Sequence, residues 1–436
     1  MTPIAAGLVG IVALLVLLAI RVPIGFSLIF VSFCGIWYLR SFDTAWSQLG
    51  IVPHEFSASW TLSAIPMFIL MGAIAHHSGI TTRLFQAARL WLGSLPGGLA
   101  VATSAASAGF AAASGSSIAM AAAMSKIAVP EMLKAGYRQS LATATVAAAG
   151  TIGSMIPPSI LFILFGWYTE TPIGQLFIAG IVPGLLTALL YMIMIVTRCK
   201  LDPSLAPPLA EKPAMTEKVD ALLKIWPLPL LIFIVIFGLY SGLTSATEAG
   251  AFGAFGALLI AVSMRQLSWK QFFASLIETV KSVATILFIA IGAVLLTRFM
   301  TMSGLPNAVA SVMADSNISE LSVIIFMAII YIVLGMFLDP LGIILITLPI
   351  LQPMFEAVGM NMIWVGVMVV KLVEIGLITP PIGLNAFIVK SSLGDQIELS
   401  QIFRGLTWFI ALELGVFILL ASYPQLSLYL PSLMAQ

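Results

Sequence analysis

The sequence GSMIPPSI at residues 153–160 returns in altered form as GLITPPIG at residues 376–383. Each copy lies inside a long apolar stretch, 139–168 for the first and 361–390 for the second. Proline has no backbone N–H, and its ring clashes with the preceding turn, so two prolines in a row interrupt a helix. The motifs therefore predict two broken helices, separated by an offset of 223 residues (380 − 157).

The composition of the chain places these broken helices in a membrane. Of the 436 residues, 60% are hydrophobic and 8% are charged, whereas soluble domains carry about 25% charged residues. A bilayer core takes about 20 apolar residues per helix. Further apolar stretches occur at 4–20, 24–40, 61–80, 173–197, 226–243, 247–264, 282–301 and 405–423. We predict an all-α polytopic membrane protein, because the two-residue alternation of a membrane barrel is not seen.

Two other apolar segments, 97–130 and 320–358, contain Gly, Pro or Asp near their middles. The polar loop 198–225 holds Arg198, Lys200, Lys212, Lys218 and Lys224. Since Lys and Arg collect in cytoplasmic loops, we place this loop in the cytoplasm. The other basic loops share that side only if both segments are re-entrant hairpins, the first entering from the cytoplasm and the second from the periplasm. Both termini are then periplasmic. The alternative, one span and a loop for each segment, breaks the charge asymmetry twice.

The offset of 223 residues also aligns parts of the chain other than the proline motifs. It aligns Ser116, in the first hairpin turn, with Asp339 in the second, and it aligns the span 61–80 with 284–303. The two copies begin on opposite sides of the predicted membrane. An inverted-topology repeat of this kind is typical of secondary transporters. The sequence therefore predicts an inverted-repeat transporter with two re-entrant hairpins and two broken helices.

The helix breaks have a chemical consequence at membrane depth. Unpaired backbone N–H and C=O groups cost several kcal/mol each in hydrocarbon, so a break persists where it lines a polar cavity or binds a ligand. Free carbonyls at the end of one half-helix suit Na⁺, and the N-terminus of the other suits an anion. Side-chain oxygens are added nearby by Ser154, Ser159, Thr379 and Asn385. The alternative is a proline kink repaired by neighbouring helices.

The predicted hairpin turns supply further candidate ligands. The first turn is SGSS at 114–117, and the second is GMFLDP at 335–340, which includes Asp339. A carboxylate at membrane depth is costly and indicates a functional site. The alternatives are close helix packing for the small residues and a surface-loop position for Asp339. Lys371 and Glu374, three residues apart on one helix face, are expected to pair with each other as a structural feature, with a functional role as the alternative.

Enzymatic functions have little support in the sequence. There is no Gly-x-x-x-x-Gly-Lys-Ser/Thr motif for nucleotide phosphates, and His54-Glu55 lacks a second histidine at the zinc-protease spacing. The two cysteines do not form a disulfide framework. The net charge of +1 gives no electrostatic indication of a partner, and no nucleic-acid partner is predicted. The chain is therefore predicted not to be an enzyme.

The ordered set of motifs resembles the large membrane subunit of a TRAP (tripartite ATP-independent periplasmic) transporter. The set runs from SGSS at 114–117, through GTIGSMIPPS at 150–159 and GMFLD at 335–339, to GLITPPIG at 376–383. It covers essentially the whole chain. The resemblance implies an elevator mechanism, in which the hairpins and broken helices form a moving transport domain, and coupling to Na⁺.

The resemblance also implies partners, cargo and location. The partners are a small four-helix membrane subunit and a soluble periplasmic binding protein, within the lipid of the bacterial inner membrane. The cargo is a small organic acid, such as a C4-dicarboxylate, sialic acid or another sugar or keto acid. A one-component sodium–carboxylate or anion transporter of related architecture stays open as an alternative, and a passive anion channel is a more distant one.

This interpretation divides the chain into scaffold and repeat regions. In order these are N-terminal scaffold helices 1–60, first repeat 61–197, cytoplasmic loop 198–225, scaffold helices with a connecting arm 226–281, second repeat 282–423 and C-terminal tail 424–436. Each repeat is expected to contain an arm helix, a hairpin, a broken helix and a following span.

The candidate ligands fall into two sodium sites and one substrate site. Sodium site 1 is assigned to Ser114, Gly115, Ser116, Ser117, Gly153 and Ile156. Sodium site 2 is assigned to Gly335, Asp339, Gly376, Thr379, Gly383 and Asn385. The substrate site is assigned to Ser116, Ser159, Asp339, Thr379 and Pro381, with the helix after Pro381 directing its N-terminus at the substrate carboxylate.

Overall fold

The fold of this chain is known from a computed structural model that describes residues 1–207, 213–315, 319–394 and 397–434. Lys212, one of the loop residues used for the orientation, lies outside the described residues. Within those residues all regular secondary structure is helical, which confirms the all-α prediction. Five of the described helices are long and apolar enough to cross a membrane, and the number is seven if each of two bent pairs is one span.

The first half of the chain contains ten α-helices and the 3-10 turn that precedes its proline pair, among the described residues. In chain order they are α1 (Pro3–Ala19), α2 (Ile24–Leu39), α3 (Phe42–Ser57), α4 (Ala64–His77), α5 (Ile80–Leu92), α6 (Gly98–Ser114), α7 (Ser117–Lys134), α8 (Gln139–Thr151), the 3-10 turn η2 (Ile152–Ser154), α9 (Ile160–Thr169) and α10 (Ile173–Leu201). Helices α6 and α7 form a helical hairpin, called hairpin 1 below. The proline pair lies between α8 and α9, in a segment called break 1.

The second half repeats this order of helices. It contains α11 (Met215–Lys224), α12 (Pro227–Tyr240), α13 (Ala246–Ser263), α14 (Trp269–Ser303), α15 (Leu305–Asp315), α16 (Glu320–Gly335), α17 (Pro340–Ala357), α18 (Met362–Ile378), α19 (Leu384–Leu393), α20 (Leu399–Ser422) and α21 (Gln425–Met434). Helices α16 and α17 form hairpin 2. The second proline pair lies between α18 and α19, in a segment called break 2.

The helix boundaries follow the 223-residue offset closely. Helix α7 begins at Ser117 and α17 at Pro340 (340 − 117), and α8 begins at Gln139 and α18 at Met362 (362 − 139). The correspondence starts earlier than the sequence indicated, because α1 and α2 match α12 and α13 to within a few residues. One element differs between the halves. Helices α3 and α4 are bent by 60° at their junction, whereas the equivalent α14 is one helix of 35 residues.

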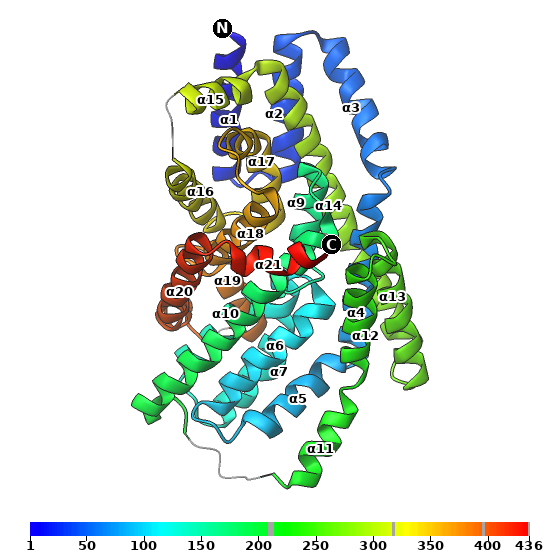
Figure 1. Ribbon diagram of the computed structural model, residues 1–436, viewed down its shortest axis with the longest axis vertical. Coiled ribbons are helices and arrows are strands. Elements are labelled where there is room, and N and C mark those ends of the chain that lie inside the picture. Colours follow the sequence, from blue (N-terminus) through cyan, green and yellow to red (C-terminus); the bar gives the residue numbers. More distant parts are fainter. Residues whose placement is uncertain (208–212, 316–318, 395–396, 435–436) are drawn as a thin grey trace.

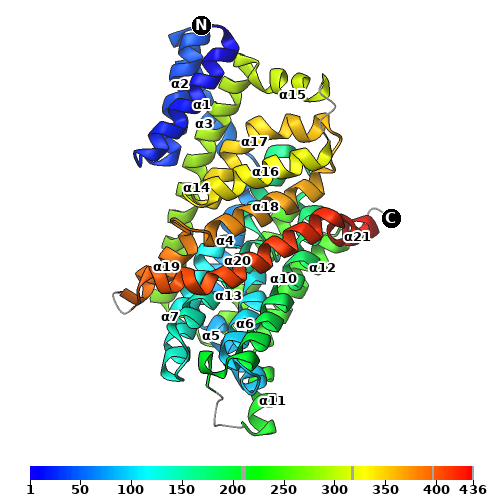
Figure 2. The same ribbon diagram turned by 90° about the vertical axis from the view of Figure 1, so that its left-hand side faces the viewer.

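The two halves interlock rather than lie side by side. Helix α14 packs against α2, and α13 packs against α4, so each contact joins one half to the other. The two hairpins lie toward opposite ends of the long axis, with α16 and α17 above and α6 and α7 below in both views (Figures 1 and 2). This arrangement places the hairpin turns toward the middle of the molecule.

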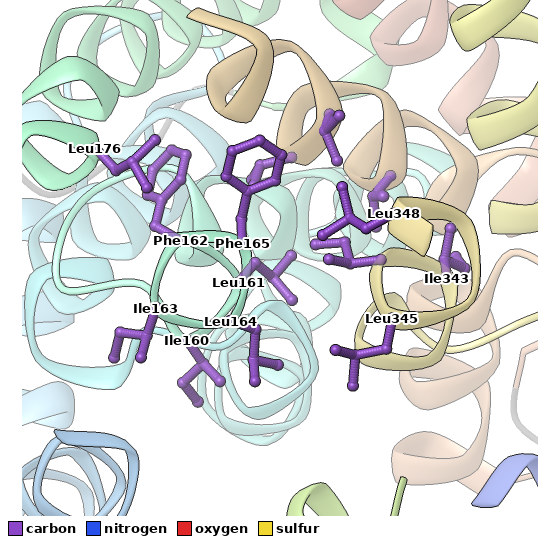
Figure 3. Packing of buried hydrophobic residues seen from close by; sticks show 14 of the residues in the cluster. Ile160, Leu161, Phe162, Ile163, Leu164, Phe165, Leu176, Ile343, Leu345 and Leu348 are labelled. Carbon is purple, nitrogen blue, oxygen red and sulfur yellow. The ribbon is translucent and has the colours of Figure 1, made fainter. Parts of the chain in front are cut away.

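The helices that follow the breaks also cross between halves. Helix α19 packs on α7 and α8, and α9 packs on α17 and α18. Figure 3 shows Leu161 of α9 facing Leu348 of α17, and both side chains are almost fully buried. In a membrane, lipid tails are as apolar as leucine, so such contacts stabilise by close packing rather than by leaving water. The packing therefore fixes each break against the other half of the chain.

Candidate functional site

The turn of hairpin 1 is joined directly to break 1. The Ile160 N–H donates to the Gly115 carbonyl at 3.2 Å. The hydroxyls of Ser117 and Ser154 lie 2.6 Å apart, and the Ser117 N–H donates to Ser154 Oγ at 3.3 Å. All of residues 151–160 are buried. Hairpin 1 therefore closes over its break and supplies hydrogen-bond partners where the helix is interrupted.

Glycine is required at position 115 for two reasons. Its φ of +61° lies in the left-handed region, which side chains rarely adopt. A Cβ at this position would also lie 2.6 Å from the Pro158 carbonyl oxygen, which is too close. A Cβ at Gly153 would lie 2.9 Å from the Ser116 carbonyl oxygen, so these two residues are in close contact as well. The small residues of the motif thus allow two backbones to meet.

Most residues of the predicted sodium site 1 come together at this junction. Ser116 caps α7, and its hydroxyl accepts from the Ala119 N–H at 3.4 Å. The Ser114 hydroxyl is buried and has no hydrogen-bond partner. Ile156 lies on the other side of the break, where it packs on Gly184 of α10. The junction therefore offers hydroxyl and carbonyl oxygens from Ser114 to Ser117 and from Gly153, with Ile156 set apart.

A cavity of about 530 Å³ opens beside the junction. One wall is formed by residues 114–117, Ser154 and the start of α17 at Pro340. The opposite wall is formed by α4 and α14 and includes His76, His77, Glu278, Ser282 and Thr285. Both hairpin turns thus reach the same cavity, which is large enough for a small organic molecule.

The residues predicted to bind substrate are only partly assembled around this cavity. Ser116 lines it, and Asp339 precedes the lining residue Pro340. Ser159 caps α9, where its hydroxyl accepts from the Phe162 N–H at 3.4 Å, and it is fully buried. Thr379 and Pro381 lie outside the lining that the structure describes.

The predicted sodium site 2 is dispersed. The backbones of Gly335 and Gly376 touch, since a Cβ at Gly376 would lie 2.5 Å from the Gly335 Cα. Asp339 caps α17, and its Oδ1 accepts from the N–H groups of Leu341 and Gly342 at 3.1 and 3.0 Å. No hydrogen bond joins the turn of hairpin 2 to break 2 among the described residues.

The remaining residues of that site lie on or beyond break 2. The Thr379 hydroxyl donates to the Ile375 carbonyl at 2.6 Å, and Gly383 directly precedes α19 with a φ of +58°. Pro380, Pro381 and Ile382 are exposed. Asn385 is fully buried against the first half, where its Nδ2 donates to the Ala147 carbonyl of α8 at 3.2 Å.

The intramembrane charges form partners that the sequence did not indicate. The predicted pairing of Lys371 with Glu374 is wrong. Lys371 forms a buried ion pair with Glu413 of α20 and donates to Thr187 of α10 at 2.9 Å. Glu374 instead accepts a hydrogen bond from the hydroxyl of Ser117, at the turn of hairpin 1. Spacing along one helix misled the prediction, because each charge faces a different neighbouring helix.

Glu413 is the site residue that the sequence reasoning missed entirely. It accepts from Tyr191, and at 3.3 Å from Thr151, in addition to its pairing with Lys371. The sequence does contain an indication of its role. Glu413 is a lone carboxylate within the apolar stretch 405–423, and such a residue indicates a buried polar contact. Its partners come from distant parts of the chain and carry no local pattern.

Comparisons with known proteins agree with this architecture. The family model described as "Tripartite ATP-independent periplasmic transporter, DctM component" matches residues 11–426. A C4-dicarboxylate TRAP transporter large permease protein of Pseudomonas aeruginosa is 37% identical, covering 88% of this chain and 89% of that protein. A sialic acid TRAP transporter large permease protein of Vibrio cholerae is 31% identical and covers 96% of both. The fold is similar to the crystal structure of the Alcanivorax borkumensis YdaH transporter, with a TM-score of 0.62 at 14% identity over 88% of each chain.

Proposed function

Because the chain belongs to the DctM component of tripartite ATP-independent periplasmic transporters, we propose that it carries a small organic acid inward across the membrane, driven by Na⁺. The resemblance inferred from the motifs is confirmed, and the family is one of transporters rather than enzymes. Sodium entry provides about 2.3 kcal/mol per charge per 100 mV of membrane potential, in addition to the concentration gradient. This supply allows accumulation without nucleotide hydrolysis.

The proposed cargo is a carboxylate. Similar permeases are named for C4-dicarboxylates, sialic acid and 2,3-diketo-L-gulonate. The N-termini of the helices that follow the breaks offer partial positive charge for a carboxylate, and the cavity beside the first of them, α9, is of suitable volume. A small four-helix membrane subunit and a periplasmic binding protein are the proposed partners, the second of which would deliver the acid.

The observation that carries the proposal is the junction of hairpin 1 and break 1 beside a cavity that both hairpin turns reach. Oxygens of Ser114 to Ser117 and Gly153 would hold one Na⁺ there. A second Na⁺ would bind when Asp339, in the turn of hairpin 2, approaches Thr379 of break 2. We infer that this second unit closes on loading and that the hairpins and broken helices then move together as an elevator.

The proposed setting is the bacterial inner membrane with both termini in the periplasm. The support is the distribution of Lys and Arg along the sequence, which places the 198–225 loop in the cytoplasm. In this orientation hairpin 1 enters from the cytoplasm and hairpin 2 from the periplasm.

Uptake by reconstituted vesicles tests the proposal. Vesicles with this chain and its small subunit receive the binding protein outside, an inward sodium gradient, and one of succinate, sialic acid or diketogulonate. We expect accumulation that needs both Na⁺ and the binding protein. Robust sodium-driven uptake by this chain alone would support the one-component alternative, and uptake that does not depend on any gradient would support a channel.

A further inference from the structure

Three lysine or carboxylate side chains of the described residues are almost completely buried in the apolar interior. Lys371, Glu374 and Glu413 have exposed fractions of 2%, 1% and 0%. Lys371 and Glu413 form an ion pair, so their charges balance each other. Glu374 is left as an additional carboxylate without a cationic side chain bound to it. An unbalanced buried charge is strongly unfavourable, so this position calls for a bound positive charge.

The hydrogen bonds of Glu374 do not provide that charge. One carboxylate oxygen, Oε1, accepts from the Ser117 hydroxyl, which in turn lies 2.6 Å from the Ser154 hydroxyl. These donors are neutral, so they satisfy lone pairs without cancelling the charge. The other oxygen, Oε2, is buried and has no hydrogen-bond partner. The carboxylate is therefore half-satisfied, and its free oxygen is an acceptor.

A second unpartnered acceptor lies close to the same junction. The Oδ1 atom of Asn385 is buried without a partner, while its Nδ2 is oriented by the Ala147 carbonyl. A Cβ built on Gly150 would lie 3.0 Å from Asn385 Nδ2 and 3.1 Å from the Ser117 carbonyl oxygen. The side chain of Asn385 and the backbone of Ser117 are thus both neighbours of Gly150. Oxygen atoms of α7, α18 and α19 therefore come together near this junction. Oxygen atoms are the groups that coordinate Na⁺ and that bind a proton.

We propose that Glu374 is the anionic group of a monovalent-cation site between the two halves of the chain, formed with the Ser117 hydroxyl and the Asn385 amide oxygen. The bound cation is Na⁺ or a proton. It balances the Glu374 charge and holds the turn of hairpin 1 against α18. Because α18 belongs to the second repeat, the cation ties hairpin 1 to the broken helix of the opposite repeat.

This inference rests on the proposed function for its role, since it makes the cation a coupling ion of the same transport cycle. It shares Ser117 with sodium site 1 and Asn385 with sodium site 2, but it differs from both in its anionic group, Glu374, and in joining hairpin 1 to the opposite repeat. The other ionisable groups whose charges act on Glu374 are Lys371 on α18, Glu413 on α20 and Tyr191 on α10. Those three are already joined to one another through Glu413.

Cation-dependent stability tests the site without any transport measurement. The full chain is purified in detergent micelles, and its Tm is recorded against Na⁺ concentration, with choline as the control cation, at several pH values. A ligand that binds the folded state raises Tm with its concentration. We expect the Tm of the wild type to rise by several degrees with added Na⁺, with falling pH, or with both.

The variant Glu374→Gln keeps the shape of the side chain and removes its charge. If the site binds Na⁺, the Na⁺ concentration for half of the Tm rise increases at least tenfold in this variant. If it binds a proton, the rise in Tm at low pH is lost while the response to Na⁺ is kept. The exposed Glu356→Gln on α17 is the matched control and should respond as the wild type does. Unchanged responses to both Na⁺ and pH in Glu374→Gln overturn the inference.

A second variant covers the case in which Glu374→Gln does not fold. Ser117→Ala removes the hydroxyl that donates to Glu374 and should shift the midpoint of the Na⁺ or pH response at least threefold. No shift in a folded Ser117→Ala protein also overturns the inference. Since the Tm assay needs neither organic acid nor partner proteins, failure of uptake in vesicles leaves its outcome standing, and the two proposals are separated.

Discussion

The two hairpin-and-break units of this chain are built on the same pattern and are held in different ways. In the first unit, the turn of hairpin 1 is joined to break 1 by hydrogen bonds of Gly115 and Ser117, and the break is buried throughout. In the second, Asp339 bonds only the N-terminus of its own helix, and Pro380 to Ile382 are exposed. In the first unit, hydrogen bonds between uncharged groups of the chain therefore hold the turn against the break.

The two turns also differ in charge at one aligned position. Ser116 and Asp339 both cap the second helix of their hairpins, at equivalent places in the repeat (339 − 116 = 223). A hydroxyl can be buried with hydrogen bonds alone, whereas a carboxylate at membrane depth requires a positive partner. We therefore expect the second unit to need a cation to close, so that its closure can report loading.

The largest expected effect comes from removing the charge of the second turn. Asp339→Asn keeps the side-chain size and its capping oxygen, but it no longer attracts a cation. We expect sodium-driven uptake to fall at least 100-fold while the protein still inserts and binds its small subunit. Uptake in vesicles and co-purification of the subunit measure the two properties. Glu356→Gln, a charge removal on the same helix, should leave uptake near the wild-type rate.

Wild-type uptake and sodium dependence in Asp339→Asn would contradict the comparison. It would mean that Asp339 is a capping residue only, and that the second unit has no cation site at this turn.

The next effect comes from forcing the first unit open. In Gly115→Ala, the left-handed φ and the 2.6 Å approach to the Pro158 oxygen both oppose the closed junction. We expect a stability loss of about 2 kcal/mol or more, since strain of this kind costs on the order of 1–3 kcal/mol, and a lower uptake. Tm and uptake are measured together.

Gly79→Ala is the matched control for this prediction. Gly79 also has a positive φ, of +79°, but a Cβ there would meet nothing within 4 Å. The control should therefore show only the backbone cost of about 1 kcal/mol. Equal effects of the two substitutions would show that the close contact of hairpin 1 with break 1 is unimportant.

A smaller effect is expected from enlarging the first turn. Ser116→Leu removes a hydroxyl from the edge of the cavity and adds apolar bulk, so the Na⁺ concentration for half-maximal uptake should rise about tenfold, the equivalent of 1.4 kcal/mol. Ser282→Leu places the same bulk on the opposite wall of the cavity. If the two variants have the same sodium response, the effect of Ser116→Leu is one of volume and the assignment of sodium site 1 is incorrect.

The sequence predicted the features that depend on local chemistry. The proline pairs mark the ends of α8 and α18, with a short 3-10 turn after α8, and the turn residues Ser116 and Asp339 occur where helices α7 and α17 begin. Proline and capping residues act within a few positions along the chain, so their effect can be read from sequence. Helices α3 and α15 lie outside the apolar stretches from which the membrane helices were predicted.

Contacts between the halves could not be read in the same way. Asn385 was assigned to the second unit by its nearness in sequence to break 2, but its helix packs on α8 of the first half. The bond between Ser117 and Glu374 joins residues 257 positions apart. No pattern along one helix specifies which distant helix a buried side chain will face, because that depends on how the two halves interlock.

Thiol labelling of the two breaks tests the central difference most directly. In a chain whose Cys34 and Cys199 are replaced, single cysteines at Ile382 of break 2 and at Ile156 of break 1 are reacted with a water-soluble thiol reagent. Rates are compared in choline, in Na⁺, and in Na⁺ with the organic acid. The account predicts that Ile382→Cys reacts readily in choline and at least tenfold more slowly when loaded, while Ile156→Cys reacts slowly throughout. Equal labelling of Ile382→Cys in all three conditions would contradict it.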